Sequence, residues 1–336
     1  MSHGGFYVPS ETLGVVETTG ITKAAKRIDK LVILSFLAGV YIAFGFMAAI
    51  SAGGRFADPG LRRLVYAGVF PVGLMFVIIA GGELFTGNTM FLIPGLLKRK
   101  ISVFDLLRVW AISFVVNCAA IILVAVVYAS ILDIPLVADF ARSLLNTKLA
   151  LNFWQLFVRG IAANWLVNLA ILLAYAANSI GGKLLGIWFS IFAFVIIGFE
   201  HSIANVFLYM VVIVIGGTEV TFWWLLWDLI PVVLGNIIGG AGFVGVLYSY
   251  IHNVERSGRL VFPPPTPMIT GERKTPIKKA GPSPLLPPGD TADVTLGTGR
   301  EASEPLLTRR SQSTPPSAGG LSARPPRPNR KEALPQ

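Results

Sequence analysis

The sequence predicts an all-α membrane protein with six transmembrane helices and a polar tail. Of its 336 residues, 54% are hydrophobic and only 14% are charged, and the mean hydropathy is +0.67. A soluble globular chain carries roughly 25% charged residues, so this composition argues against an ordinary soluble enzyme. The apolar residues are concentrated between Lys30 and His252 and become sparse after Ser257. Averaged values therefore combine two different regions, an apolar body and a polar tail.

Six apolar segments are each long enough to cross a bilayer, which takes about 20 helical residues. They are Leu31–Gly53, Leu64–Ile93, Val103–Leu132, Trp154–Asn178, Leu184–Ile215 and Phe222–Ile251. An even number of crossings places both termini on the same side of the membrane.

The basic residues predict which side that is, because lysine and arginine collect in cytoplasmic loops. One set of flanks contains Lys23, Lys26, Arg27, Lys30, Lys98, Arg99, Lys100, Lys183, Arg256 and Arg259. The opposite set contains Arg55, Arg62, Arg63, Arg142 and Lys148. We therefore expect both termini in the cytoplasm and a multi-pass protein of the plasma membrane.

These boundaries divide the chain into a cytoplasmic N-terminal segment (1–30), a transmembrane domain (31–252) and a basic, proline-rich cytoplasmic tail (253–336). From Ser257 onward the tail holds twelve basic and six acidic residues, and we expect it to be disordered. Its only aromatic residue is Phe262, which argues against nucleic acid as a partner. The stretch from Arg324 to Pro328 suits an SH3-type cytoplasmic partner, and a merely solvated tail is the alternative.

No cofactor, metal or enzymatic activity is expected. The single cysteine, Cys118, excludes a CxxC metal site, and HExxH, GxSxG and P-loop motifs are all missing from the sequence. His3 and His252 lie outside the predicted apolar core, so His201 has no histidine partner there.

The second and fifth segments are each about 30 residues long and contain polar residues near their middle. Residues 77–88 read VIIAGGELFTGN, and residues 195–205 read VIIGFEHSIAN. They occupy matching places in two halves of three spans each, and an odd number of spans gives the halves opposite orientations. Interrupted helices at corresponding positions of inverted halves predict a transport site at the bilayer midplane. The alternative is a pair of glycine kinks with no function.

Glu83, Glu200 and His201 are the ionisable residues deepest in apolar surroundings, where each charge costs at least a few kcal/mol. Such residues often mark a pathway through a helix bundle. A structural explanation also exists, because a carboxylate can accept backbone N–H groups freed at a helix break and a histidine can be a satisfied core residue.

The two broken segments closely resemble the paired signatures of the formate/nitrite transporter family. The resemblance rests on Glu83–Asn88 and Gly198–Asn205, and it extends to residues 30–42 of the first span, Ala163–Val167 of the fourth and Leu229–Gly240 of the sixth. The motifs stand in the family's order over roughly residues 20–252. The tail has no counterpart in typical bacterial members, which suggests a eukaryotic, protozoan-type member.

The resemblance implies a homopentamer with one aquaporin-like pore in each protomer. It implies His201 as the central pore histidine, Thr86 as its hydrogen-bond partner and Asn164 as a neighbour. The remaining implied positions are Phe70 and Phe194 at an outer constriction, Leu74, Leu84 and Phe85 at an inner one, Lys148 in the outer vestibule, Lys23 at the cytoplasmic mouth, and Glu83, Glu200, Gly87, Asn88 and Asn205 as structural residues of the breaks. Ordinary packing of the apolar residues and interfacial anchoring by the lysines are the alternatives.

For a small monocarboxylate, protonation at pH 7 costs roughly 4 kcal/mol, less than moving the bare anion through an apolar ring. The hypothesis is therefore anion–proton symport of formate, lactate or a similar weak acid, with His201 either exchanging a proton or only forming a hydrogen bond. An uncoupled channel for nitrite or another small anion is the alternative. A neutral-solute channel and a membrane scaffold that displays the tail are more distant ones.

Overall fold

The computed structural model describes residues 6–216 and 219–257, with side chains as far as His252. Apart from one isolated bridge between Phe6 and Ala177, the regular structure in this part of the chain is helical. The last helix ends at Ser257. The remainder of the predicted tail lies outside the described residues.

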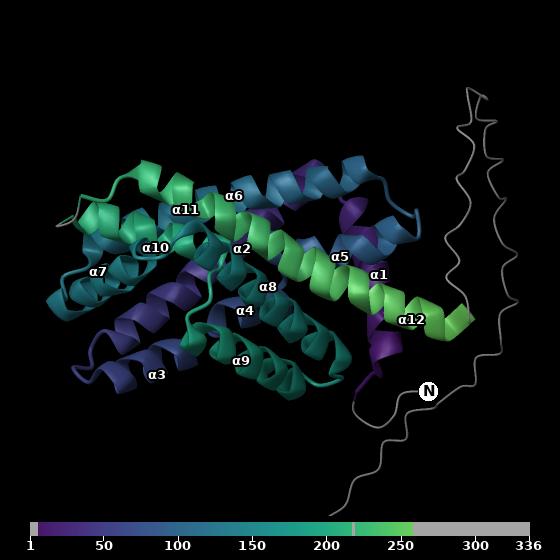
Figure 1. Ribbon diagram of the computed structural model, residues 1–336, viewed down its shortest axis with the longest axis horizontal. Helices are drawn as coiled ribbons and strands as arrows, with labels where there is room; N and C mark the ends of the chain where they lie inside the picture. Colours follow the sequence, from purple (N-terminus) through teal and green to yellow (C-terminus); the bar gives the residue numbers. More distant parts are fainter. Residues whose placement is uncertain (1–5, 217–218, 258–336) are drawn as a thin grey trace, which may run out of the picture. The chain divides into compact units, whose positions relative to one another are not determined.

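Six helices in the described ranges are long and apolar enough to cross a membrane, which confirms the predicted all-helical membrane fold. They are α2 (Ile28–Gly53), the run from α3 (Pro59–Val69) through α4 (Val72–Phe76) and η1 (Val77–Gly81), α6 (Val103–Ile131), α8 (Phe153–Ala176), α9 (Ile180–Ile197), and the run from α11 (Phe222–Ile237) through η2 (Ile238–Val246) and α12 (Leu247–Ser257). The last of these runs forms the long green helix that crosses the front of Figure 1.

Two shorter apolar helices, α5 (Phe85–Leu97) and α10 (Ser202–Ile215), complete the second and fifth predicted segments. Helical geometry stops at Gly81 and resumes at Phe85, and it stops again at Ile197 and resumes at Ser202. A glycine with a positive φ angle stands at the end of the first helix of each pair. Gly81, at 91°, is the last residue of η1, and Gly198, at 88°, directly follows α9. Only glycine adopts this conformation without steric cost, so these two residues end the preceding helices.

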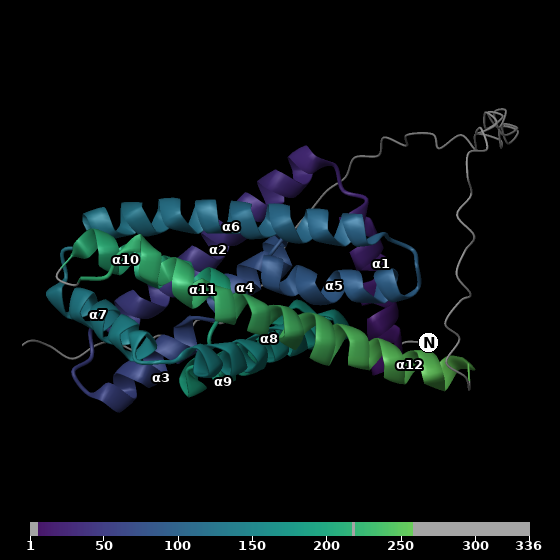
Figure 2. The same ribbon diagram turned by 45° about the horizontal axis from the view of Figure 1, so that its top comes forward.

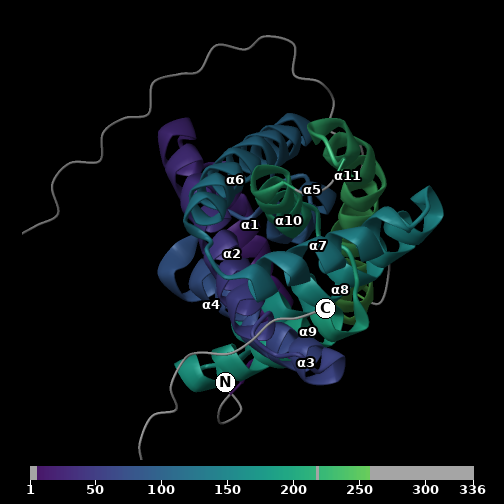
Figure 3. The ribbon, with the colours of Figure 1, turned by 90° about the vertical axis from the view of Figure 1, so that its left-hand side faces the viewer.

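The short helices α5 and α10 lie in the interior, as the end-on view in Figure 3 shows. Helix α10 packs against α6, α11, α7 and α2, and α5 packs against α1, α6, α8 and η2. Most of their side chains are buried. The long outer helices instead expose large apolar side chains such as Phe104, Ile131, Trp154, Trp223 and Trp227. This distribution suits a protein surrounded by lipid, where apolar groups need not point inward.

Two short, weakly apolar helices were not predicted, α1 (Pro9–Ala24) and α7 (Pro135–Leu149). Each begins with a proline in its first turn and has a lysine, Lys23 or Lys148, in its last turn. Helix α7 lies at one end of the bundle and α1 at the other, as Figure 2 shows. At 16 and 15 residues they are too short to span a bilayer. Their function in the fold is to carry these two lysines to opposite ends of the interior.

Glycines allow the outer helices to approach their neighbours closely. A Cβ atom on Gly235 would lie 2.3 Å from the carbonyl oxygen of Phe157, and one on Gly39 would lie 2.6 Å from that of Asn117. Because these distances are far below van der Waals contact, α8 against α11 and α2 against α6 pack backbone to backbone. Such close packing fixes the positions of the polar side chains that these helices carry into the core.

Candidate functional site

His201 is the N-cap residue of α10, and it is only 4% exposed. Its Nδ1 atom accepts the backbone N–H of Ala204 at 3.2 Å, while its Nε2 atom lies 2.9 Å from Oγ1 of Thr86 on α5. A ring nitrogen that accepts an N–H carries no proton of its own. The proton of the neutral imidazole therefore resides on Nε2, which donates it to the Thr86 hydroxyl. The local fold thus assigns both the tautomer and the orientation of the ring.

The imidazole faces a small chamber whose other walls are apolar. Besides His201, the chamber is lined by Ile42, Phe70, Leu74, Leu84, Val167, Ile191 and Phe194. Its volume is about 10 Å³, near the minimum that holds one water molecule. The rings of Phe70 and Phe194 meet edge to face with centroids 5.7 Å apart, and Phe194 lies 6.2 Å from the His201 ring. We call this space the central chamber.

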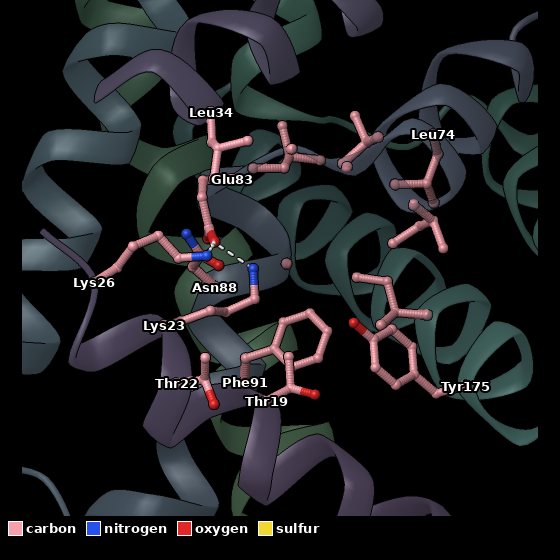
Figure 4. A pocket seen from close by; sticks show the side chains of 17 residues that line it. Thr19, Thr22, Lys23, Lys26, Leu34, Leu74, Glu83, Asn88, Phe91 and Tyr175 are labelled. Carbon is pink, nitrogen blue, oxygen red and sulfur yellow. Dashed lines mark hydrogen bonds and ion pairs between the residues drawn. The ribbon is translucent and has the colours of Figure 1, made fainter. Parts of the chain in front are cut away.

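A cavity of about 220 Å³ lies at Glu83, and we call it the Glu83 cavity. Figure 4 shows two lysines of the α1 region reaching the carboxylate, with Lys23 Nζ at 2.6 Å and Lys26 Nζ at 3.1 Å. Two lysines against one carboxylate leave a net charge of +1 in the lining. Leu74 and Leu84 line this cavity as well as the central chamber, so the two spaces share these leucines as a wall.

A second cavity, of about 90 Å³, lies at Glu200, and we call it the Glu200 cavity. Glu200 Oε2 accepts hydrogen bonds from Lys148 Nζ at 2.6 Å and from Asn205 Nδ2 at 2.8 Å. Phe70, Phe194 and His201 line both this cavity and the central chamber. The Phe70–Phe194 contact therefore separates the Glu200 cavity from the chamber, as Leu74 and Leu84 do on the other side.

Two asparagines on the outer helices brace the two breaks with the same set of hydrogen bonds. Asn117 of α6 accepts the N–H of Phe85 and donates to the carbonyl oxygens of Ser35 and Glu83. The sixth span repeats this pattern: Asn236 accepts the N–H of Ser202 and donates to the carbonyl oxygens of Gly160 and Glu200.

The backbone N–H groups of the two glutamates also correspond, since Glu83 donates to Leu34 and Glu200 donates to Arg159. Each side chain or carbonyl satisfies a polar group that the helix break would otherwise leave unpaired in apolar surroundings. The breaks are therefore built alike in the two halves of the chain.

The two breaks differ in the residue that precedes each short helix and in the asparagine of its first turns. Leu84 is the N-cap of α5 and has no polar side chain to cap it, whereas the equivalent position in the second half is His201, which caps α10. Asn205 donates to Glu200, but no hydrogen-bond partner is found for the side chain of its equivalent, Asn88, within the described residues. The single imidazole of the core thus belongs to the second half only.

Further asparagines fix Thr86 opposite the imidazole. Asn164 Nδ2 donates to the Thr86 carbonyl oxygen at 3.1 Å, to Thr89 Oγ1 at 3.0 Å and to the Asn236 carbonyl oxygen at 2.6 Å. Asn168 adds a second donor to the Thr86 carbonyl oxygen at 3.2 Å. Asn164 therefore acts on His201 through the position of Thr86.

Most of the residues that the resemblance singled out meet around the chamber and the two cavities. Three of them, Phe85, Thr86 and Asn164, are not among the lining residues of these spaces. Thr86 is hydrogen-bonded to His201 and Asn164 to Thr86, whereas the ring of Phe85 packs against Trp110 and Phe114 of α6. The place of Phe85 at the inner constriction stays a prediction. Gly87 lines the Glu83 cavity, where a Cβ atom would lie 3.0 Å from Ile171 Cδ1.

The predicted site residues did not include Asn117, Asn168 and Asn236, nor Lys26 and the two arginines of the Glu200 cavity, Arg63 and Arg159. The asparagines had a signal, because an amide inside an apolar span is costly unless it is hydrogen-bonded. Their partners lie on other spans, so only the fold reveals what each one holds.

A family model described as formate/nitrite transporter matches residues 10–250 of the chain. The chain belongs to the formate/nitrite transporter family. This family consists of transporters and channels, so the protein is a multi-pass integral membrane protein and not an enzyme.

Relatives in three organisms agree with this assignment. A probable formate transporter of Methanothermobacter thermautotrophicus is 42% identical over 74% of this chain and 98% of its own length. The formate channel BtFdhC of Bacillus thuringiensis is 35% identical over 75% of this chain and 98% of its own. Formate-nitrite transporter 3 of Toxoplasma gondii is 30% identical over 92% of this chain and 62% of its own.

Solved structures of the family share the fold. One described as an FNT family ion channel aligns with a TM-score of 0.67 at 31% identity, over 72% of this chain and 98% of its own. Another, described as a pentameric formate channel with formate bound, gives a TM-score of 0.60 at 28% identity, over 67% and 98%.

Proposed function

We propose that this member of the formate/nitrite transporter family moves small monocarboxylates, such as formate and lactate, together with a proton. The cargo enters a cavity as the anion and crosses the central chamber as the neutral acid. The observation that carries the proposal is the chamber itself, where apolar side chains surround one imidazole between two cavities with cationic linings. The formate channels among the chain's relatives support this class of cargo.

The size of the chamber opposes passage of a charged, hydrated ion. A space of about 10 Å³ leaves no room for a hydration shell, and the apolar walls provide no replacement for one. An unpaired ion in such surroundings costs many kcal/mol. Protonating a carboxylate with a pKa near 4 costs roughly 4 kcal/mol at pH 7. The neutral acid is therefore the cheaper permeating form.

His201 is proposed to act as a neutral hydrogen-bond donor and not as a carrier of the proton. Protonation of Nδ1 would break its hydrogen bond with the Ala204 N–H. It would also place a positive charge at the N-terminus of α10, where the helix dipole disfavours a cation. The Nε2–H group can instead be shared between the Thr86 hydroxyl and an oxygen of the passing acid.

The lysines at the cavities are proposed to attract the anion before it is protonated. The Glu83 cavity has a net positive lining because Lys23 and Lys26 face a single carboxylate. A positive field at a pore entrance raises the local anion concentration, and salt screens the effect.

The orientation and assembly are also proposals. The Glu83 cavity would open to the cytoplasm, on the side of both termini and of the more basic flanks. The protein would be a homopentamer in the plasma membrane, as the pentameric formate channel with a similar fold suggests.

The test is uptake of labelled formate or lactate into proteoliposomes at a series of external pH values. Uptake should rise as the external pH falls, and accumulation should follow the proton gradient. Uptake driven by voltage without a pH dependence would favour the alternative, an uncoupled channel for nitrite or another small anion, which the family description also covers.

A further inference from the structure

We infer that Arg63 and Arg159 form an anion-binding site in the Glu200 cavity, and that it selects planar anions with two equivalent oxygens, such as carboxylates. This inference rests on the proposed function and adds an entry site with a defined ligand chemistry. Both arginines line the cavity beside Lys148 and His201. They come from different outer helices, Arg63 from α3 and Arg159 from α8.

The fold holds both guanidinium groups at the broken end of α9. Arg63 Nε donates to the carbonyl oxygen of Ile196 at 2.8 Å, and Arg159 Nη1 lies 3.4 Å from that of Gly198. Carbonyl groups at a helix C-terminus have no partner inside the helix and carry a partial negative charge, which favours a cation there. The helix break therefore fixes one edge of each guanidinium group.

Gly198 makes room for this arrangement. Its φ angle of 88° suits glycine, and a Cβ atom at this position would lie 2.7 Å from Nη2 of Arg63. A side chain at residue 198 would therefore displace the guanidinium from the cavity wall. The glycine serves both to end α9 and to admit the arginine.

Donor groups remain on both arginines. A guanidinium carries five N–H donors in a planar fork, and the described residues provide one acceptor for each of these two, both of them backbone carbonyls. The one carboxylate that lines the cavity, Glu200, already accepts hydrogen bonds at Oε2 from Lys148 and Asn205. Neither arginine forms an ion pair among the residues that the structure describes.

The lining of the Glu200 cavity is also more positive than that of the Glu83 cavity. Arg63, Arg159 and Lys148 face Glu200, which gives the lining of the Glu200 cavity a net charge of +2. The corresponding value for the Glu83 cavity is +1. The excess in the Glu200 cavity comes from arginines, whose fork matches a carboxylate with two parallel hydrogen bonds. A spherical ion such as chloride gains no such match. The volume of about 90 Å³ is several times that needed for one water molecule, so a small carboxylate fits.

The first test measures the KM for formate entering from the Glu200 side in proteoliposomes of defined orientation, using Arg63→Gln and Arg159→Gln. Each should raise this KM about three- to tenfold, and entry from the Glu83 side should keep its KM. Arg62→Gln is the matched control, because Arg62 donates to the Phe56 carbonyl oxygen, lies over the Phe140 ring and does not line the cavity. An unchanged KM in both variants, or an equal rise in Arg62→Gln, would overturn the inference.

Variants that fail to assemble are replaced by Arg63→Lys and Arg159→Lys, which keep the charge but lose the fork, and by Gly198→Ala, which displaces Arg63. Each should raise the KM from the Glu200 side, and a wild-type KM in all three would equally refute the site.

The second test needs no transport, so it separates failure of this site from failure of the proposed function. Purified protein is labelled with the arginine reagent phenylglyoxal, and each modified arginine is quantified by mass spectrometry. Sodium formate should protect Arg63 and Arg159 more than sodium chloride at the same ionic strength, with Arg62 unaffected by either salt. Equal labelling in both salts would contradict the site, whether or not the protein transports formate.

Discussion

Thr86 and His201 meet across the two helix breaks, with 2.9 Å between Thr86 Oγ1 and His201 Nε2. Thr86 belongs to the first turn of α5, and His201 is the N-cap of α10. The hydrogen bond thus joins the two halves of the chain at the central chamber. Because Nδ1 is occupied by the Ala204 N–H, this bond uses the only remaining polar atom of the ring.

Replacing Thr86 should therefore separate the role of its hydroxyl from that of its shape. Thr86→Val removes the hydroxyl and leaves the buried Nε2–H without its acceptor, which should lower stability by about 1–3 kcal/mol. Thr86→Ser keeps the hydroxyl and should stay close to wild type. Thermal unfolding of the detergent-solubilised oligomer measures both. Equal stability of the two variants would show that the hydroxyl contributes nothing to the stability of the fold.

Replacing His201 should separate its capping role from its role in the pathway. His201→Phe removes the cap and the Nε2–H donor, and pH-driven formate uptake should fall at least tenfold. His201→Asn supplies an N-cap side chain of a favoured type, so α10 should keep its stability to within about 1 kcal/mol. Uptake assays and unfolding are measured side by side. Full uptake by assembled His201→Phe would remove the imidazole from the mechanism.

The two bracing asparagines, Asn117 and Asn236, should contribute equally to the stability of the protein. Asn117→Ala and Asn236→Ala each leave a buried backbone N–H and two carbonyl groups without their partner. Each should lower the free energy of unfolding by about 2–4 kcal/mol. Asn146→Ala, at an exposed position of α7, is the control and should change little. A much smaller cost for one of the two asparagines would mean that the braces are unequal.

Glu17 should make the attachment of α1 depend on pH. Burial acts to raise the pKa of its carboxyl, but hydrogen bonds from Lys100 and Lys98, at 2.8 and 2.6 Å, outweigh burial and hold the pKa below its ordinary value of 4.5. A depressed pKa in the folded state means that the stabilisation is complete above 4.5 and is lost as the pH falls through the folded-state value.

The measurement is hydrogen exchange of the α1 amides in wild type and Glu17→Gln. At pH 7 the variant should show weaker protection of α1, and the difference between the two proteins should shrink as the pH is lowered below 4.5. A difference that stays constant over this range would show that the charge of Glu17 does not hold the helix.

Much of the fold could be predicted because a bilayer imposes simple rules on a sequence. Backbone groups in hydrocarbon must be satisfied within the segment, so each crossing is an apolar helix of predictable length. All six predicted spans begin within about five residues of the start of an observed helix. The interruption near Glu83 was also visible, because glycines and a carboxylate are costly in a continuous apolar helix.

Helices α1 and α7 could not be predicted in this way. Both are short and only weakly apolar, so neither has the periodic apolar run that identifies a span. Their lysines therefore resembled interfacial anchors. In the structure Lys23 and Lys148 are ion-paired with glutamates of the two breaks, which are far away in sequence.

The sequence alone determined that this is a six-span membrane protein with two polar interruptions, because hydrophobicity and span length are local properties. It also determined that one imidazole lies between apolar runs. Tertiary structure decided which nitrogen of His201 carries the proton, which asparagines hold the breaks and where the arginines gather. Those outcomes depend on hydrogen bonds of about 3 Å between residues on different helices, and such distances exist only after the helices have packed.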